Sequence, residues 1–166
     1  MSDLIRMLKN AGVVVSRDVN LRAGEKSNFY VDVKKAYGEH EILHYLAIAM
    51  SKIINSDVTC VATKGYGGLP LATTVSQIMK IHLSMVRDEI KEHGLGKLIV
   101  GYTPNADDRV VIVDDVMTSG GSLNEVADAI EKTGASILGA YVVVKRSDIN
   151  MRFPVKYLVH ADDLLS

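Results

Sequence analysis

The strongest constraint in this sequence is the segment Val110–Ser122, where an apolar run changes abruptly into acids and small residues. The run Val110–Val113 is β-branched at all four positions, which is typical of a strand buried on both faces of a parallel sheet. Asp114 and Asp115 follow at once, at the carboxyl end of that strand, where α/β proteins bind their ligands. Adjacent carboxylates there can accept hydrogen bonds from sugar hydroxyls or hold magnesium through water. The segment therefore predicts an α/β fold with a site at this strand end.

A helix is predicted directly after the strand. Ser122 and Glu125 have the spacing of a capping box, and the apolar residues that follow recur at helical spacing up to about Gly134. The turn 118–121 can aim backbone N–H groups at one point, where the helix dipole also favours an anion. It is neither a P-loop nor a dinucleotide fingerprint, because neither glycine pattern is present. The turn is a candidate phosphate site.

Strand, acid pair, Thr-x-Gly-Gly turn and helix together resemble the phosphoribosyl pyrophosphate (PRPP) signature of type I phosphoribosyltransferases. An ordinary buried strand with a polar turn would explain the apolar run but not the adjacent acids and glycine-rich turn. The resemblance implies that PRPP is bound by Asp114, Asp115, Val116, Met117, Thr118, Ser119, Gly120, Gly121 and Ser122.

Composition limits the other classes of function. The 166 residues, 48% of them hydrophobic, are enough for one domain with a full core, and we expect one domain over 1–166. A formal charge of −1 argues against non-specific binding to nucleic acid or membranes. The single cysteine, Cys60, excludes an internal disulfide and suits a reducing compartment. Because we see neither a signal-peptide core nor an apolar run of transmembrane length, we expect a soluble, cytoplasmic protein.

Hydrophobic periodicity predicts alternating strands and helices along the chain. Further helices are expected at 2–10, 39–55 and 69–80. Strands are expected at 13–15, 58–62, 82–86, 98–102, 137–144 and 155–160, and the basic turn beginning at Leu21 leads into another. This order implies a mainly parallel central sheet flanked by helices.

Two more segments are expected at the same edge of the sheet. Thr63–Pro70 is glycine-rich and lies between a buried strand and a helix, so it is a second candidate anion loop. A tight turn that needs glycine only for steric reasons is the alternative. Arg87–Lys97 is charged and contains two glycines, which is usual for a solvated loop. A mobile lid that closes on pyrophosphate would need the same cations and hinges.

With these segments the resemblance narrows to the orotate phosphoribosyltransferases and covers nearly the whole chain. The matching parts are Leu21–Ser27, Thr63–Pro70, Arg87–Gly94, Val110–Ser122 and Arg146. The resemblance implies a type I phosphoribosyltransferase fold with a small N-terminal hood and a flexible lid loop. It also implies the transfer of ribose 5-phosphate from PRPP to orotate, with Mg2+ carried by PRPP, and a homodimer in which each lid serves the neighbouring site.

Roles for individual residues follow from the same resemblance. The orotate side would comprise Arg22, Lys26, Tyr30, Thr118 and Arg146. Further PRPP contacts would come from Lys64, Gly65, Arg87, Lys91 and His93. Catalysis would involve Lys91, His93 and Asp115, with His93 either a proton donor to pyrophosphate or a cationic anchor.

Two positions depart from the family's pattern. Asp88 stands where many members have a second basic residue after the lid arginine, and Gly67 stands where some members have lysine. A glycine-rich version of the second loop also belongs to the family's range. Pyrophosphate contacts are therefore either fewer than in those members or replaced by Lys64 or Lys97.

Other functions compete with this interpretation. The segment His40–His44 matches the H-E-x-x-H zinc protease pattern, but Ala47 and Met50 replace the glycine and histidine of its extended form. A solvated start of a helix explains it more simply. A phosphoribosyltransferase for uracil, adenine or hypoxanthine is a second alternative, and a PRPP-binding regulator that acts on nucleic acid is a third.

Overall fold

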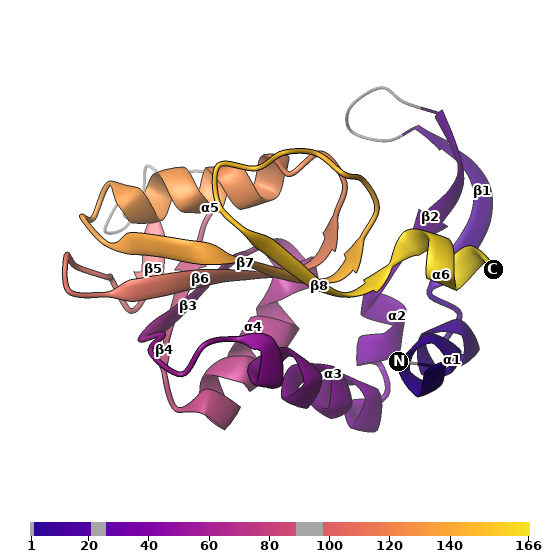
Figure 1. The fold of residues 1–166 in the computed structure, drawn as a ribbon, viewed down its shortest axis with the longest axis horizontal. Coiled ribbons are helices and arrows are strands. Elements are labelled where there is room, and N and C mark those ends of the chain that lie inside the picture. The colour runs from indigo at the N-terminus through magenta and orange to yellow at the C-terminus, as the bar shows by residue number, and fades with distance from the viewer. Residues whose placement is uncertain (1, 21–25, 89–97) are drawn as a thin grey trace.

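A computed structural model describes residues 2–20, 26–88 and 98–166 of the chain. Its main sheet has the strand order β5-β4-β3-β6-β7-β8 (Figure 1). The strands are β3 (Cys60–Lys64), β4 (His82–Val86), β5 (Ile99–Gly101), β6 (Arg109–Met117), β7 (Ser136–Lys145) and β8 (Val155–His160). All neighbouring pairs are parallel except β4 and β5. The prediction of a mainly parallel sheet flanked by helices is confirmed.

Helices cover both faces of this sheet. Figure 1 shows α3 (His40–Ile53) and α4 (Gly65–Met79) on one face and α5 (Gly121–Glu131) on the other. In β6, Val111 and Val113 belong to the core on the α3 and α4 side, whereas Val110 and Ile112 pack towards α5. Residues 110–113 of β6 thus face a core on each side of the sheet, which explains why all four are apolar. No helix in the described part of the chain is long and apolar enough to cross a membrane.

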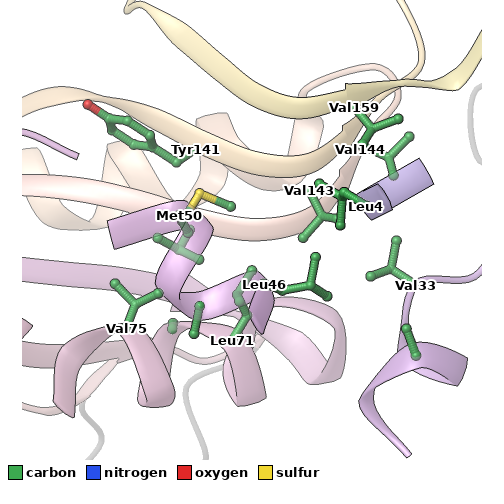
Figure 2. Packing of buried hydrophobic residues seen from close by; sticks show 14 of the residues in the cluster. Leu4, Val33, Leu46, Met50, Leu71, Val75, Tyr141, Val143, Val144 and Val159 are labelled. Atoms are coloured by element: carbon green, nitrogen blue, oxygen red, sulfur yellow. The ribbon is translucent and has the colours of Figure 1, made fainter. Parts of the chain in front are cut away.

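The core on the α3 and α4 side fills the space between two helices and the sheet. Figure 2 shows Leu46 and Met50 of α3 beside Leu71 and Val75 of α4, with Val143 of β7 facing them. These five side chains are all fully buried. The helical spacing of the apolar residues in α3, from which the sequence predicted a helix at 39–55, is the spacing that produces this contact.

A second, smaller sheet pairs β1 (Val14–Asn20) with β2 (Lys26–Val31) in antiparallel fashion beside the main sheet. Its position fits the small N-terminal hood that the resemblance implies. The neighbouring helices are α1 (Ser2–Asn10), α2 (Lys34–Tyr37) and α6 (Ala161–Leu165), of which α2 and α6 were not predicted. Both are short, with four and five residues, so they show no helical periodicity in the sequence.

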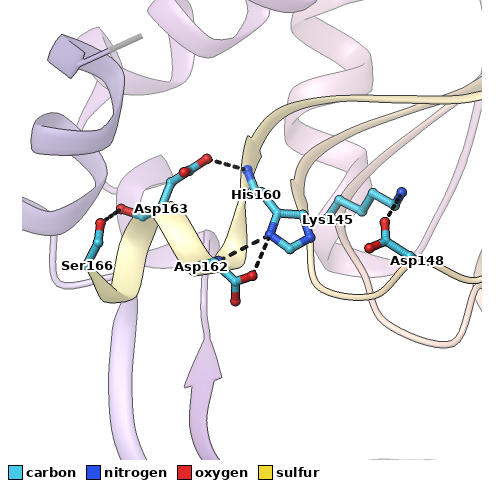
Figure 3. Close-up of polar contacts among 6 residues, drawn as sticks. All are labelled: Lys145, Asp148, His160, Asp162, Asp163 and Ser166. Carbon is cyan, nitrogen blue, oxygen red and sulfur yellow. Dashed lines mark hydrogen bonds and ion pairs between the residues drawn. The ribbon is translucent and has the colours of Figure 1, made fainter.

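The last helix, α6, is held at both of its ends. The backbone N–H of Asp162 donates to Nδ1 of His160, and the backbone N–H of His160 donates to the Asp163 carboxylate (Figure 3). Lys9 of α1 donates to the backbone oxygen of Ser166 at 2.6 Å. The C-terminal segment is thereby joined to the first helix of the chain.

The amino ends of the strands are tied together by Asp108, which is buried just before β6. Its carboxylate accepts hydrogen bonds from Thr59 Oγ1 at 2.7 Å, Tyr102 Oη at 2.9 Å and the Asn105 backbone N–H at 2.9 Å. The Tyr102 ring stacks on His82 at the start of β4. Burial by itself would raise the pKa of Asp108, but these hydrogen bonds outweigh it and hold the pKa below its usual value. Asp108 therefore stabilises the edge of the sheet at which the parallel strands begin.

We expect Asp108→Ala to lower the free energy of unfolding by about 2 kcal/mol, because three donors lose their acceptor. Urea unfolding followed by circular dichroism measures this. Asp107→Ala, at the exposed neighbouring position, is the control and should change stability by less than about 0.5 kcal/mol. Equal effects of the two substitutions would contradict the role of Asp108.

Candidate active site

The acid pair lies inside β6, which continues through Met117 instead of ending before the acids as predicted. Asp114 is 7% exposed and still pairs with Val142 of β7, while the side chain of Asp115 is 13% exposed. Burial raises the pKa of Asp114, and the negative charge of Asp115 raises it further. Asp114 is therefore the more buried of the two carboxylates, and its surroundings disfavour its ionised form.

Each of the two carboxylates has protein partners. Oδ1 of Asp114 accepts from the Asp115 backbone N–H at 2.9 Å, and its Oδ2 accepts from Ser122 Oγ at 3.2 Å. Oδ1 of Asp115 accepts from the Val116 backbone N–H at 2.9 Å, and its Oδ2 lies 3.5 Å from Nζ of Lys34. The acids are thus held in defined orientations at the carboxyl end of β6.

The turn after β6 leads into α5, as predicted, but the predicted capping box is wrong. The N-cap of α5 is Gly120, with φ +73°, and no side chain caps the helix. Ser122 points to Asp114 instead of capping. Because no side chain caps α5, the backbone N–H groups of its first turn are available to an anion. The left-handed backbone of Gly120 directs the chain into this turn.

Residues after β7 brace this turn from outside. Ser147 Oγ donates to the Thr118 carbonyl, and the Arg146 backbone N–H donates to the Met117 carbonyl at 2.9 Å. Met151 packs so closely that a Cβ on Gly120 would lie 2.9 Å from its Cε. Ser119 and Gly121, in contrast, are exposed. The turn therefore has one supported side and one open side.

The second glycine segment is not a loop, which corrects that prediction. Helix α4 begins at Gly65, four residues before the predicted start, so Gly65–Pro70 forms its first turns. Pro70 is the sixth residue of α4, so the helix lacks one backbone N–H donor at that position. A Cβ on Gly67 would overlap the Asp115 carboxylate, and one on Gly68 would lie 2.7 Å from the Val113 carbonyl oxygen. These glycines let α4 approach the acid pair.

Lys64, at the start of α4, forms ion pairs with Glu125 of α5 and, at 3.2 Å, with Asp88. Its pKa is raised, with the hydrogen bond to Glu125 as the main cause. Asp88, the departure from the resemblance noted above, therefore has a basic partner in this chain. Any anion that binds Lys64 has to compete with two carboxylates.

Helix α2 brings in a residue that sequence reasoning missed. Lys34 Nζ lies 2.9 Å from Asp32 Oδ1 and reaches Asp115 as well. An acid and a lysine two residues apart after an apolar strand were the available signal. The pattern is too common to indicate a site without the tertiary contact.

On the other side of the turn, Arg146 contacts the small sheet. Its guanidinium lies 4.4 Å from the centre of the Phe29 ring, and Nη2 donates to the Phe29 carbonyl at 3.4 Å. Burial lowers the pKa of Arg146 from its usual value. Tyr30 follows on β2 and is 36% exposed. The structure thus brings the predicted Arg146 to the small sheet that carries Tyr30.

Several predicted residues fall at or beyond the limits of the described structure. Arg87 is exposed directly after β4, and its backbone N–H donates to the Leu98 carbonyl at 2.9 Å. The candidate residues that lie outside the described residues are Arg22, Lys91, His93 and Lys97, and the side chain of Lys26 is likewise not described. Their predicted roles stay predictions.

The zinc protease pattern forms the start of α3, where His40 and His44 are both exposed. No group of three or more potential metal ligands occurs among the described residues. The pattern is explained by a solvated face of this helix.

Comparison with known proteins assigns the fold. Residues 34–153 match the model of the phosphoribosyl transferase domain family. The orotate phosphoribosyltransferase of Methanosphaera stadtmanae is 38% identical over 87% of this chain and 82% of its own length. That of Methanosarcina mazei is 37% identical over 88% of this chain and 78% of its own length. The crystal structure of the Aeropyrum pernix orotate phosphoribosyltransferase superposes with a TM-score of 0.83 at 26% identity, covering 98% of this chain and 96% of that one.

The two glycines of α4 allow a paired test of the packing. Gly68→Ala is expected to cost about 1–3 kcal/mol of stability, because its Cβ meets the rigid backbone of β6. Gly67→Ala should change stability by less than about 1 kcal/mol, because only the end of the Asp115 side chain has to rotate. Urea unfolding of both variants measures the difference. Equal losses would show that Gly67 also faces rigid structure.

Proposed function

This chain belongs to the phosphoribosyltransferase family, among the orotate phosphoribosyltransferases, and from this premise we infer that it transfers the ribose 5-phosphate of PRPP to orotate. The products are orotidine 5'-monophosphate and pyrophosphate, which places the reaction in pyrimidine nucleotide synthesis. The observation that carries the proposal is the acid pair of β6 leading directly into the open turn of α5. A ribose phosphate needs this combination of hydroxyl acceptors and an anion site.

In the proposed complex the open side of the turn 118–121 holds the 5'-phosphate through backbone N–H groups, assisted by the dipole of α5. Asp114 and Asp115 accept hydrogen bonds from the ribose hydroxyls. Because β6 is buried and hydrogen-bonded on both sides, these acceptors are fixed before the substrate arrives. Positioning of this kind contributes to catalysis by removing the need to order the reacting groups.

Breaking the bond between ribose C1 and the pyrophosphate oxygen leaves positive charge on the ribose and negative charge on the leaving group. We propose that Arg87, Lys91 and His93 stabilise that negative charge, with Lys64 and Gly65 at the start of α4. Lys64 contributes to the extent that pyrophosphate displaces Asp88 or Glu125 from it. A homodimer whose lid residues serve the neighbouring site is part of the proposal and is supported by the family resemblance.

Magnesium belongs to the proposal as a companion of PRPP. The oxygens of Asp114 and Asp115 already accept hydrogen bonds or contact Lys34, so these residues suit a hydrated ion held through water more than direct coordination. When bound, the ion would neutralise part of the pyrophosphate charge.

We propose that Arg146 recognises the carboxylate of orotate. Its guanidinium is held in place by the Phe29 ring, and a planar fork of N–H donors matches a carboxylate. Tyr30, Thr118, Arg22 and Lys26 complete the proposed orotate side. An anionic base is thereby favoured over uracil or a purine.

The direct test is a spectrophotometric assay with PRPP and magnesium that compares orotate with uracil, adenine and hypoxanthine. We expect turnover of orotate alone, and loss of turnover when a chelator removes magnesium. If a different base is turned over instead, that base is the substrate and the proposal of orotate is wrong. PRPP binding without turnover of any base would favour a regulatory protein.

Arg146→Ala should raise the KM for orotate by roughly 10–100-fold, the cost of losing charge-assisted hydrogen bonds, and the KM for PRPP by less than about threefold. Steady-state kinetics with each substrate varied in turn measures the two values. Arg146→Lys keeps the positive charge but not the planar pair of N–H donors. Its KM for orotate should lie between those of Arg146→Ala and the unchanged enzyme. Equal weakening of both substrates would count against the assignment.

A further inference from the structure

Helix α2 places a basic side chain against the acid pair of β6. Lys34 Nζ lies 2.9 Å from Oδ1 of Asp32 and 3.5 Å from Oδ2 of Asp115. The Asp32 side chain is 26% exposed and that of Asp115 is 13% exposed, so both carboxylates are partly shielded from water. Lys34 is therefore the bridge between the end of the small sheet and the candidate ribose site.

The backbone around Lys34 is firmly anchored. Val33 and Ala36, on either side of it, are fully buried, and the backbone N–H of Asp32 donates to the Val13 carbonyl at 2.7 Å. The Lys34 side chain leaves this anchored turn and keeps 41% of its surface exposed. A lysine on a fixed backbone can hold a carboxylate in one orientation at a smaller entropic cost than a lysine on a mobile loop.

Tyr37, at the other end of α2, faces the same carboxylates. Its hydroxyl is buried and has no hydrogen-bond partner among the described residues. Burial raises the pKa of Tyr37, and the charges of Asp115 and Asp114 raise it further, as expected for a phenol close to both acids. Lys34 and Tyr37, at the two ends of α2, thus both lie near the acid pair.

The charges at this point need compensation if an anion is to bind. PRPP carries phosphate groups at two ends, and Asp32 and Asp115 would repel them. Lys34 offsets this negative charge and lies 3.5 Å from Oδ2 of Asp115, while the Val116 N–H donates to Oδ1. Each oxygen of the Asp115 carboxylate then has a partner.

We propose that Lys34 is a positioning residue that orients and neutralises Asp115 for the binding of PRPP, and that Asp32 holds Lys34 in place. This inference rests on the proposed function for the identity of the ligand. Lys34 acts through Asp115 and does not itself contact the reacting atoms. Its contribution is made equally to bound substrate and transition state, so it affects the KM for PRPP more than kcat.

The test compares Lys34→Ala with the enzyme of unchanged sequence in steady-state kinetics and in calorimetric titration with PRPP and magnesium. We expect the KM and Kd for PRPP to rise about tenfold, equivalent to about 1.4 kcal/mol. The KM for orotate and kcat should stay within about threefold of their original values. Lys34→Arg keeps the charge and should restore PRPP binding to within about threefold. Lys35→Ala, at the exposed next position of α2, is the matched control and should change neither constant.

The pathway through Asp115 is tested by repeating the titration in an Asp115→Asn background. In that background Lys34→Ala should raise the Kd for PRPP by less than about twofold, because the negative charge of Asp115 is already absent. A full tenfold loss in that background would mean that Lys34 contacts PRPP directly and would overturn the positioning role. Unchanged PRPP binding by Lys34→Ala in the original background would overturn the inference altogether.

Two further measurements distinguish a loss of PRPP binding from unfolding of the variant and from failure of the proposed function. Thermal unfolding of Lys34→Ala checks the fold, and Lys34→Gln, which retains a long polar side chain, replaces it if the alanine variant unfolds at assay temperature. If the unchanged enzyme binds PRPP but does not turn over orotate, the proposed function fails while the titration still decides the role of Lys34.

Discussion

The structure depends on placing a buried carboxylate, Asp114, beside a partly buried one, Asp115, at the end of a strand that is covered on both faces. A buried carboxylate is costly unless it is hydrogen-bonded, and two neighbouring charges repel each other. Backbone N–H groups and the Ser122 hydroxyl donate hydrogen bonds to Asp114 and Asp115, which offsets the cost of burial. The Lys34 ammonium offsets part of the negative charge. Gly68 follows from the close packing of α4 on this strand, because a Cβ there would lie 2.7 Å from the Val113 carbonyl oxygen, and Gly67 leaves room for the Asp115 carboxylate.

The two ends of β6 show how the surroundings decide what a buried aspartate does. Asp108, before the strand, is surrounded by donors, and its pKa is lowered. Asp114, near the other end, is about equally buried, and burial together with the charge of Asp115 raises its pKa. The first arrangement ties strands together, whereas the second maintains unfavourable electrostatics, which is typical of sites that bind ligands or carry out chemistry. The hydrogen bonds of Asp108 and the candidate site thus lie at opposite edges of one sheet.

Much of the fold followed from periodicity, but elements without periodicity did not. The strand at 110–113 was predicted from four consecutive β-branched residues, and the helix at 39–55 from apolar residues at helical spacing. Helix α2, with four residues, has no such repeat, so the contact of Lys34 with Asp115 was missed. The segment 65–70 was predicted as a loop because its glycines and proline resemble a turn, yet packing against β6 makes it the start of α4. The Ser122–Glu125 spacing suggested a capping box, but Ser122 hydrogen-bonds a carboxylate from another element.

By itself, the sequence determined the α/β class, the order of the main elements, the acid pair and the turn that leads into α5. These depend on residues that are neighbours in the chain or repeat with a regular period, so local chemistry is enough to identify them. Only the tertiary structure decided which cation compensates Asp115, which acids occupy Lys64, and that Arg146 lies against Phe29 of the small sheet. Each of these contacts joins segments distant in sequence. Such pairings depend on how the helices and the two sheets pack, and no local pattern encodes that.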